Sequence, residues 1–317
     1  MAETIYDCII VGAGPAGLAS AIYTARDRYK TLVLEKFYPG GQINNTGKIE
    51  NFPGFMQVGG QEFAGKLYEQ AMSFGAEIKT GAAVRALKRR EDAIIEVETK
   101  KQTYLAKTVI LCPGSNYRKL GVPGEEQLTG TGVSYCGTCD APFFRDKEVI
   151  SVGGGNTALE EAMHLAKFCS KVTIIHRRDE FRAEKVLVEE LLEKASAPDS
   201  NIEIMYDTVL DAIEGEGKVE RALLRNIKTG ETTVKTCDGV FVFVGMVPGT
   251  GFLEGCVELE ENGLIKCDAA TLKTSMPGVF VAGDCRSGAA MQLATAIGDG
   301  VLAALMLKNY IRDPQWW

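Results

Sequence analysis

The stretch Gly12-Ala13-Gly14-Pro15-Ala16-Gly17 decides how this chain begins to fold. It follows an apolar run at residues 5–11, which is typical of a parallel strand buried on both faces. Residues 16–26 then favour a helix, and residues 31–35 favour a second strand. The first glycine permits a tight turn, the second lets the backbone approach a pyrophosphate, and the third lets helix and strand pack closely. The spacing therefore predicts a βαβ unit that binds a dinucleotide at the helix N-terminus.

The same arrangement returns near the middle of the chain. A predicted strand at residues 147–153 leads into Gly153-Gly154-Gly155-Asn156-Thr157-Ala158, a helix to about residue 168 and a strand at residues 171–176. Ala158 takes the place of the third glycine, which the pattern permits. In both units the residue at the end of the second strand lies 23 positions after the first glycine (35 − 12 and 176 − 153). Two dinucleotide-binding units in one chain are a weak form of internal repeat.

The two units differ where the adenosine ribose would lie. The first ends in Glu35, whose carboxylate can accept hydrogen bonds from ribose hydroxyls, as FAD or NAD requires. The second ends in His176-Arg177-Arg178, and Arg182 follows. Guanidinium groups bind a 2′-phosphate well, so this unit suits NADP. The alternative for the arginines is a solvated basic face without a ligand.

Composition limits the class of protein. The 317 residues are 45% hydrophobic and 24% charged, which is ordinary for a soluble protein of two domains. The net charge of −7 argues against a surface for nucleic acid. No apolar run is long enough for a membrane span, and no signal peptide is visible, so a cytoplasmic location is expected. The nine cysteines are too scattered for a disulfide framework, and two histidines make a metal site improbable, so no metal is expected.

Glycine and proline mark two joints between domains. The strand at residues 108–112 runs into Pro113-Gly114, and the strand at residues 239–244 runs into residues 245–249. The second dinucleotide unit lies between these joints. The sequence therefore predicts a discontinuous domain at residues 1–115 and 248–317, which carries the unit suited to FAD or NAD, and an inserted domain at residues 118–245, which carries the unit suited to NADP, with a hinge at the crossovers. The fold class is α/β, with two Rossmann-like domains.

Cys136 and Cys139 form the close cysteine pair of the chain, and Asp140 follows them directly. A zinc site would need another pair of soft ligands, and none is visible. The pair is either two buried structural cysteines or a redox dithiol, and the two dinucleotide units in the chain favour the dithiol. Asp140 is a candidate acid that protonates a leaving thiolate, and its alternative is a helix N-cap.

The C-terminal part carries a third candidate region. Gly283-Asp284 follows a short apolar strand, and residues 291–307 favour a helix. Asp284 can accept hydrogen bonds from the ribityl or pyrophosphate side of a flavin cofactor, although an N-cap or a turn is the simpler explanation for it alone. Trp316 and Trp317 are expected to pack on the last helix, and the alternative is that they cover a flavin or dock a partner.

With these motifs in their order, the chain resembles the low-molecular-weight, bacterial-type thioredoxin reductases over essentially its full length. The resemblance implies FAD, NADPH, a homodimer and a thioredoxin or thioredoxin-like partner. It also implies a rotation between the domains, with Cys139 next to the flavin and Cys136 attacking the partner. The implied cofactor-binding residues are Gly12, Gly14, Pro15, Ala16, Gly17, Glu35, Gly41, Gln42, Asn51, Gly114, Gly283, Asp284 and Gln292 for FAD, and Gly153, Gly155, Asn156, Thr157, Ala158, His176, Arg177, Arg178 and Arg182 for NADPH.

The chain also departs from the family pattern. Met291 stands where an arginine usually precedes Gln292, and Cys112-Pro113-Gly114 and Asn156-Thr157 replace more common residues. These changes bear on the choice of electron donor. The alternatives are a flavin disulfide reductase of the same fold that uses reduced ferredoxin, one that serves a peroxiredoxin or another thioredoxin-like partner, and a non-enzymatic flavin or NADP sensor.

Overall fold

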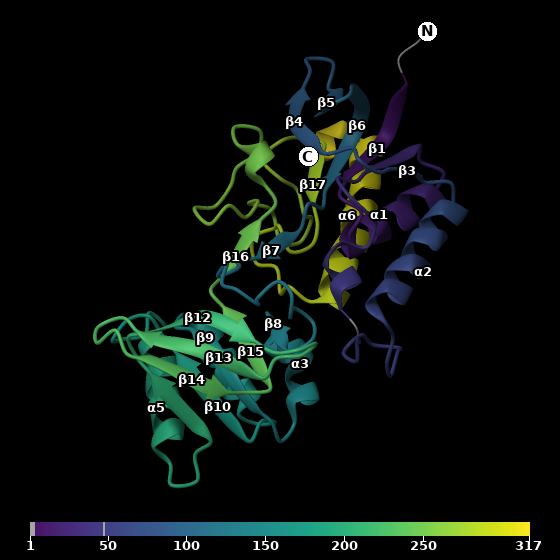
Figure 1. The fold of residues 1–317 in the computed structure, drawn as a ribbon. Coiled ribbons are helices and arrows are strands. Elements are labelled where there is room, and N and C mark those ends of the chain that lie inside the picture. The colour runs from purple at the N-terminus through teal and green to yellow at the C-terminus, as the bar shows by residue number, and fades with distance from the viewer. Residues whose placement is uncertain (1–3, 47) are drawn as a thin grey trace. The chain divides into compact units, whose positions relative to one another are not determined.

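The computed structural model describes residues 4–46 and 48–317, and the chain divides into two compact units. The first unit is Met1–Asn116 with Val247–Trp317, and the second is Tyr117–Met246. The crossovers are the strands β7 (Ser115–Tyr117) and β16 (Met246–Pro248), which pair with each other. The second unit is thus one continuous stretch of sequence, inserted between the two segments that make up the first unit (colours in Figure 1).

A sheet with strand order β3-β2-β1-β6-β5-β4 forms the middle of the first unit, and β17 also pairs with β6. Strands β1, β2, β3, β6 and β17 are parallel, whereas β4 and β5 form an antiparallel extension. The strands are β1 (Ile5–Val11), β2 (Thr31–Leu34), β3 (Glu77–Lys79), β4 (Val84–Arg89), β5 (Ile95–Thr99), β6 (Thr103–Leu111) and β17 (Val279–Val281). The helices are α1 (Pro15–Arg26), η1 (Gly41–Asn45), α2 (Gly60–Ser73), η3 (Gly251–Leu253), α6 (Leu293–Arg312) and η4 (Pro314–Trp316).

The parallel strands of this sheet end together. The register pairs Val11 with both Leu34 and Leu111, and Leu111 with Val281. The segments that follow these four residues therefore leave the sheet at one edge. Ligands of parallel α/β sheets bind at this carboxyl edge, so the register positions the candidate site.

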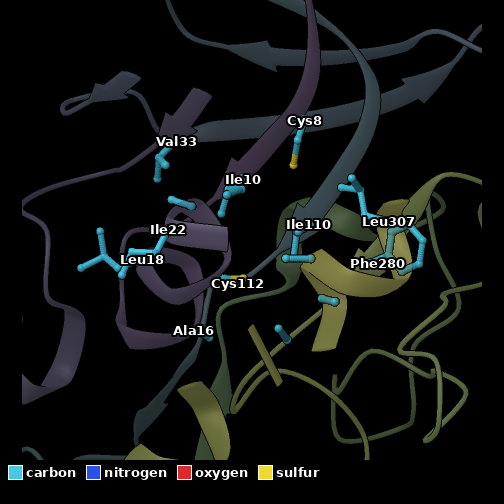
Figure 2. Packing of buried hydrophobic residues seen from close by; sticks show 14 of the residues in the cluster. Cys8, Ile10, Ala16, Leu18, Ile22, Val33, Ile110, Cys112, Phe280 and Leu307 are labelled. Carbon is cyan, nitrogen blue, oxygen red and sulfur yellow. The ribbon is translucent and has the colours of Figure 1, made fainter. Parts of the chain in front are cut away.

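Helices α1 and α6 lie side by side on this sheet (Figure 1). They approach closely because Gly300 has no side chain, and a Cβ there would lie 2.2 Å from the Ala16 carbonyl oxygen. The Ser20 hydroxyl donates to the Gly300 carbonyl across the gap, at 2.9 Å. Figure 2 shows Leu18 of α1 and Phe280 of β17 in the core between the layers, where neither is exposed. Burial of each such side chain contributes roughly 2 kcal/mol.

The C-terminal tryptophans belong to the same core. The Trp317 ring packs edge-on against Phe280 and Tyr310, with ring centroids 5.1 and 5.4 Å apart. The Lys273 ammonium lies over the Trp316 ring and donates to the Trp316 carbonyl at 2.7 Å. The two tryptophans therefore pack the C-terminal end of α6 against the rest of the first unit. This agrees with the simpler of the two explanations, which is packing on the last helix.

The second unit is built on a parallel sheet with strand order β11-β10-β9-β15-β8, and the antiparallel strands β12, β13 and β14 form a separate sheet. The strands are β8 (Val133–Ser134), β9 (Glu148–Gly153), β10 (Lys171–Ile175), β11 (Ile202–Met205), β12 (Thr208–Glu214), β13 (Arg221–Asn226), β14 (Thr232–Thr236) and β15 (Gly239–Phe243). The helices are α3 (Gly137–Asp140), η2 (Ala141–Phe144), α4 (Asn156–Leu165) and α5 (Lys185–Ser196). Val152, Ile175 and Val242 share one row near the carboxyl edge.

These units confirm the predicted α/β class with two Rossmann-like folds, although three helix ends were predicted wrongly. The last helix ends at Arg312 rather than at residue 307. The last helix begins at Leu293 rather than at residue 291, because Met291 has a left-handed φ of 54° and Gln292 is the N-cap. Helix α4 ends at Leu165 rather than near residue 168. The Asn201 side-chain amide donates hydrogen bonds to the carbonyl oxygens of Ala166 and Cys169, at 2.9 and 2.8 Å. These bonds support the turn that ends this helix.

Among the described residues, no helix has the length and apolarity needed to cross a membrane.

Candidate functional site

The cysteine pair lies at the carboxyl edge of the second sheet. Strand β8 runs parallel to β15, with Ser134 opposite Phe241, and Cys136 follows two residues later. Cys136 and Cys139 are joined by a disulfide with a Cα–Cα distance of 5.3 Å. Cys136 is the N-cap of α3, and its Sγ accepts a hydrogen bond from the Cys139 N–H at 3.2 Å. The seven other cysteines are free thiols. The pair is therefore a disulfide in a tight turn and not two separate structural thiols.

Helix α4 fixes this turn through Glu161. Its carboxylate accepts hydrogen bonds from the Thr138 N–H at 2.7 Å and from the Thr138 hydroxyl at 3.0 Å. A side chain on Gly137 would place its Cβ 2.2 Å from a Glu161 oxygen. The carboxylate therefore holds Thr138 by two hydrogen bonds and leaves no room for a side chain at Gly137. Sequence reasoning missed Glu161, because no spacing rule relates a residue inside α4 to a turn 23 residues earlier.

Asp140 closes the turn on its other side. Its carboxylate accepts a hydrogen bond from the Ser134 hydroxyl at 2.6 Å, and its side chain makes no N-cap hydrogen bond to η2. Burial raises the pKa of Asp140, and the hydrogen bond from Ser134 opposes that rise. The carboxyl group therefore stays protonated to a higher pH than a solvated aspartate, as a proton donor requires. The N-cap alternative gains no support from these contacts.

Tyr135, directly before the pair, is also held by a carboxylate. Its hydroxyl donates to Glu125 at 2.9 Å, and Glu125 is 1% exposed. Glu125 also accepts from the N–H groups of Leu120 and Gly121 at 3.0 and 2.7 Å. Burial, together with Glu125, raises the pKa of Tyr135 to about 12. The segment before Cys136 is thus anchored to the loop that follows the first crossover.

The second glycine motif forms an open cradle at the same sheet edge. A Cβ on Gly153 would lie 2.6 Å from both the Ala158 Cβ and the Phe243 carbonyl oxygen, so this position has room only for glycine. Gly155 is the N-cap of α4, makes no side-chain cap and has open space where a Cβ would point. Thr157 is exposed in the first turn. The N-terminus of α4 is therefore free to bind an anion.

Asn156, at the start of the same helix, is already bound within the protein. Its amide donates to the Glu184 carboxylate and accepts from the Glu184 N–H, both at 2.9 Å. Both ends of the Asn156 side chain thus bind the N-cap of α5. Its position beside the cradle follows from the motif, but its side chain joins two helices.

His176 and the arginines after it border this cradle. The His176 ring packs against Gly154, where a Cβ would lie 2.3 Å from Nδ1. His176 is 5% exposed, and its Nε2 is a buried atom without a hydrogen-bond partner among the described residues. Burial and the charges of the three arginines lower the pKa of His176, so the ring is neutral near pH 7. A neutral ring with an orphaned nitrogen can accept or donate one hydrogen bond to a ligand.

Arg177, Arg178 and Arg182 are exposed. Across residues 4–46 and 48–317, none of their guanidinium groups pairs with a carboxylate. The neighbouring Asp179 pairs with Lys228 instead, at 2.9 Å. The backbone N–H of Arg182 donates to the Gly154 carbonyl at 2.8 Å, which brings this segment back to the glycine turn. Three unpaired guanidinium groups beside a phosphate cradle suit an additional phosphate.

The first glycine motif has the same geometry in the first unit. Gly12 has a φ of 101°, and a Cβ there would lie 2.2 Å from the Cys112 carbonyl oxygen. A Cβ on Gly17 would lie 1.9 Å from the Gly12 carbonyl oxygen. Gly14 caps α1 without a side chain and Pro15 begins the helix, followed by the buried Ala16. Glu35 accepts from the N–H groups of Ala13 and Phe37, each at 2.7 Å, so its carboxylate is fixed beside this turn.

The other predicted residues of the first unit differ in their contacts. Gly41 lies against Gly14, since a Cβ on Gly41 would be 3.1 Å from the Gly14 Cα. Gln42 donates to the Ser115 carbonyl, and the Asn51 amide donates to the Gln292 side chain at 3.3 Å. Gly114, after β6, has a φ of 68° and open space where a Cβ would point.

Gly283 and Asp284 follow β17 at the same edge. A Cβ on Gly283 would lie 3.0 Å from the Ala16 Cβ, so this turn touches the start of α1. Burial, together with the charge of Asp299, raises the pKa of Asp284 to about 6, and Arg286 opposes the rise. Arg286 is bound in a bidentate pair by Asp299, at 2.7 and 3.0 Å. Asp284 is thus a half-buried polar group whose carboxyl can bind a ligand hydroxyl.

In the described part of the chain, no group of three histidine, cysteine, aspartate or glutamate side chains could hold a metal ion.

Known proteins resemble this chain along nearly its whole length. Residues 6–300 match the family model described as pyridine nucleotide-disulphide oxidoreductase. The chain is 41% identical to a thioredoxin reductase of Bacillus subtilis, over 99% of this chain and 97% of that protein. It is 43% identical to a thioredoxin reductase of Treponema pallidum, over 98% of each. The crystal structure of thioredoxin reductase from Streptococcus pyogenes is 40% identical, with a TM-score of 0.91 over 98% of this chain and 99% of that one.

Proposed function

We propose that this chain, which belongs to the pyridine nucleotide-disulphide oxidoreductases and within them to the thioredoxin reductase family, is an NADPH-dependent thioredoxin-disulfide reductase. The observation that carries the proposal is the Cys136–Cys139 disulfide in the same unit as an open dinucleotide cradle. When bound, NADPH supplies a hydride and FAD passes the electron pair on to the disulfide.

The first unit has the residues that would hold FAD. The uncapped N-terminus of α1 at Gly14 suits the pyrophosphate, and the fixed carboxylate of Glu35 suits the adenosine ribose. Asp284 and the open position at Gly114 lie in segments that leave the same sheet edge. Residues 1–115 and 248–317 would accordingly be the FAD-binding domain.

The second unit has the residues that would hold NADPH. The cradle at Gly153 and Gly155 suits the pyrophosphate, and the unpaired Arg177, Arg178 and Arg182 suit the 2′-phosphate. The orphaned Nε2 of His176 is a free hydrogen-bonding atom that such a ligand could use. A solvated basic face would explain the exposure of the arginines but not this buried, unpaired atom. Residues 118–245 would accordingly be the NADPH-binding domain.

The cysteines carry the transfer to the protein substrate. Reduction of the disulfide takes two electrons and two protons and gives two thiols. The Cys136 thiolate then attacks the partner's disulfide, and a mixed disulfide forms as one partner sulfur leaves. Attack by Cys139 on Cys136 restores the internal disulfide and releases the second partner sulfur. Asp140, half-buried and with a raised pKa, would hold the proton that a leaving thiolate takes.

The assembly and location belong to the same proposal. Its partner would be a thioredoxin or thioredoxin-like protein, and the enzyme would be a cytoplasmic homodimer, as the family resemblance implies.

The first test is NADPH oxidation by the purified flavoprotein with and without oxidised thioredoxin. We expect turnover that requires thioredoxin, prefers NADPH to NADH and is abolished by Cys139→Ser. Cys237→Ser, the same change at a buried free thiol of the same unit, should retain it. Turnover that survives Cys139→Ser would contradict the proposal. If neither NADPH nor NADH reduces the flavin but reduced ferredoxin does, the electron donor is ferredoxin and not NADPH. If the protein binds flavin but reduces no disulfide substrate, the non-enzymatic sensor becomes the better explanation.

A further inference from the structure

The Ser134 hydroxyl connects Asp140 with the redox turn. It lies 2.6 Å from an Asp140 carboxylate oxygen, 3.1 Å from the Cys136 nitrogen and 3.3 Å from the Cys136 carbonyl oxygen. The Cys136 N–H is a donor, so the serine oxygen accepts from it. The serine side chain is 5% exposed, so water does not replace these partners.

A hydroxyl at this place can satisfy Asp140 in both of its protonation states. When Asp140 is ionised, the serine proton points to the carboxylate, which is the shorter of its two contacts. When Asp140 is protonated, the acid can donate to the serine oxygen, and the serine proton can turn to the Cys136 carbonyl. A half-buried acid that gains and loses a proton in each cycle needs a neighbour with this property, because an unpaired buried donor or acceptor is costly.

We infer that Ser134 is a positioning residue that aims the Asp140 carboxyl at the redox turn and fixes the pH at which it exchanges its proton. The inference rests on the role of Asp140 in the proposed function. Loss of the hydroxyl removes a hydrogen bond that favours the ionised form, so Asp140 would hold its proton to a higher pH.

The ionisable groups on the described segments next to Asp140 have other partners or are exposed. On α4, which packs against α3, Glu161 is bound to Thr138, Glu160 is exposed, and His164 packs against Phe168. Helix η2, which follows Asp140, contains only alanine, proline and phenylalanine. Tyr135, which follows Ser134 directly, donates to Glu125 at 2.9 Å. The other titratable groups of the described turn are Cys136 and Cys139 after reduction, and both are reactants.

The chain supplies a matched control in Ser151. Ser151 shares a sheet row with Ser134, since both are paired with Phe241 on either side of β15. Its hydroxyl is fully buried and has no hydrogen-bond partner among the described residues. Ser151→Ala and Ser134→Ala are therefore the same change at neighbouring buried positions, and only one of them touches Asp140.

The experiment measures thiol–disulfide exchange by the full-length flavoprotein. The protein is first reduced with dithiothreitol, and the dithiothreitol is then removed under anaerobic conditions. The probe is a small aromatic disulfide, and the measured phase is the one that Cys136→Ser removes. In the wild type the rate should rise with pH as Asp140 becomes able to accept the proton of the attacking thiol. This rise is the acid limb of the pH–rate profile, and Asp140→Asn should abolish it. Ser134→Ala should move the limb upward by about one pH unit. Ser151→Ala should leave it in place.

Ser134→Thr and Ser134→Val keep the test decisive if alanine disturbs the fold. The two side chains have the same shape, and only threonine keeps the hydroxyl. Threonine should restore the wild-type limb, and valine should shift it as alanine does. The inference is overturned if valine and threonine give the same profile. It is overturned together with the role of Asp140 if the limb survives Asp140→Asn. If the shifts appear but thioredoxin is not a substrate, the inference stands and the proposed partner is wrong.

Discussion

The two glycine motifs of this chain form the same turn but obtain the necessary room in different ways. In the first unit Gly17 must lack a side chain, because its Cβ would collide with the Gly12 carbonyl at 1.9 Å. In the second unit Ala158 keeps its methyl group, and Gly153 makes the room for it. Close approach of helix and strand is therefore what the motif requires, and either partner can provide it.

The ends of the second strands differ more. The Glu35 carboxylate is fixed by two backbone N–H groups, whereas Arg177, Arg178 and Arg182 are exposed and unpaired among the described residues. The same strand–turn–helix–strand unit thus ends in a hydrogen-bond acceptor, the Glu35 carboxylate, in the first unit and in a positively charged surface in the second. Under the proposed function, the turn would bind the pyrophosphate in both units, and the end of the second strand would select the nucleotide.

The largest expected effect breaks the symmetry of the two turns. Gly17→Ala should destabilise the first unit by about 3 kcal/mol or more, because backbone atoms cannot yield to the new methyl group. Ala158→Gly should cost the second unit only about 1 kcal/mol, the price of glycine in a helix. Both tryptophans lie in the first unit, so tryptophan fluorescence reports its unfolding alone, and circular dichroism follows both units.

Two outcomes would contradict this contrast. Either Gly17→Ala leaves the fluorescence transition where it was, or Ala158→Gly moves it as far as Gly17→Ala does.

The next effect concerns the half-buried acid of the first unit. The pKa of Asp284 is raised from its ordinary value of 3.8 to about 6 in the folded chain, mainly by burial. Its contribution to stability is therefore fully present below pH 3.8 and is lost as the pH rises through about 6. The shift corresponds to no more than roughly 3 kcal/mol.

Asp284→Asn, which cannot ionise, should therefore raise the unfolding temperature of the flavin-free protein at pH 8 and change it little at pH 4. Tryptophan fluorescence measures this for the first unit. A stabilisation of equal size at both pH values would show that the charge of Asp284 is not the cause.

The smallest expected effect sharpens the contrast between the strand ends. Arg178→Ala should raise the KM for NADPH about tenfold or more and leave the KM for NADH unchanged, because only NADPH has the phosphate that this guanidinium would bind. Arg225→Ala is the control, since Arg225 is paired with Asp211 at 2.6 and 2.9 Å. Equal losses with both nucleotides would mean that Arg178 supports the fold and does not read the 2′-phosphate.

Sequence reasoning succeeded where function depends on neighbours in the chain. Glycine spacing and the apolar runs beside it predicted both βαβ units and the α/β class, because turn, helix N-terminus and strand are consecutive there. It failed at helix ends such as Met291, whose left-handed φ is a property of the folded loop. It also gave no role to Ser134, Glu125 or Glu161, although each contacts a segment next to the cysteines.

The sequence by itself determined the family, the disulfide pair and the two nucleotide motifs, because these depend on residue type and local spacing. Which carboxylates contact the residues next to the cysteines, and which acid has a raised pKa, depends on the folded chain. Glu161 reaches Thr138 because α4 packs on the redox turn, and burial raises the pKa of Asp140 because the chain covers it. Desolvation and hydrogen bonds between distant residues arise only when the chain is folded, so no local pattern can encode them.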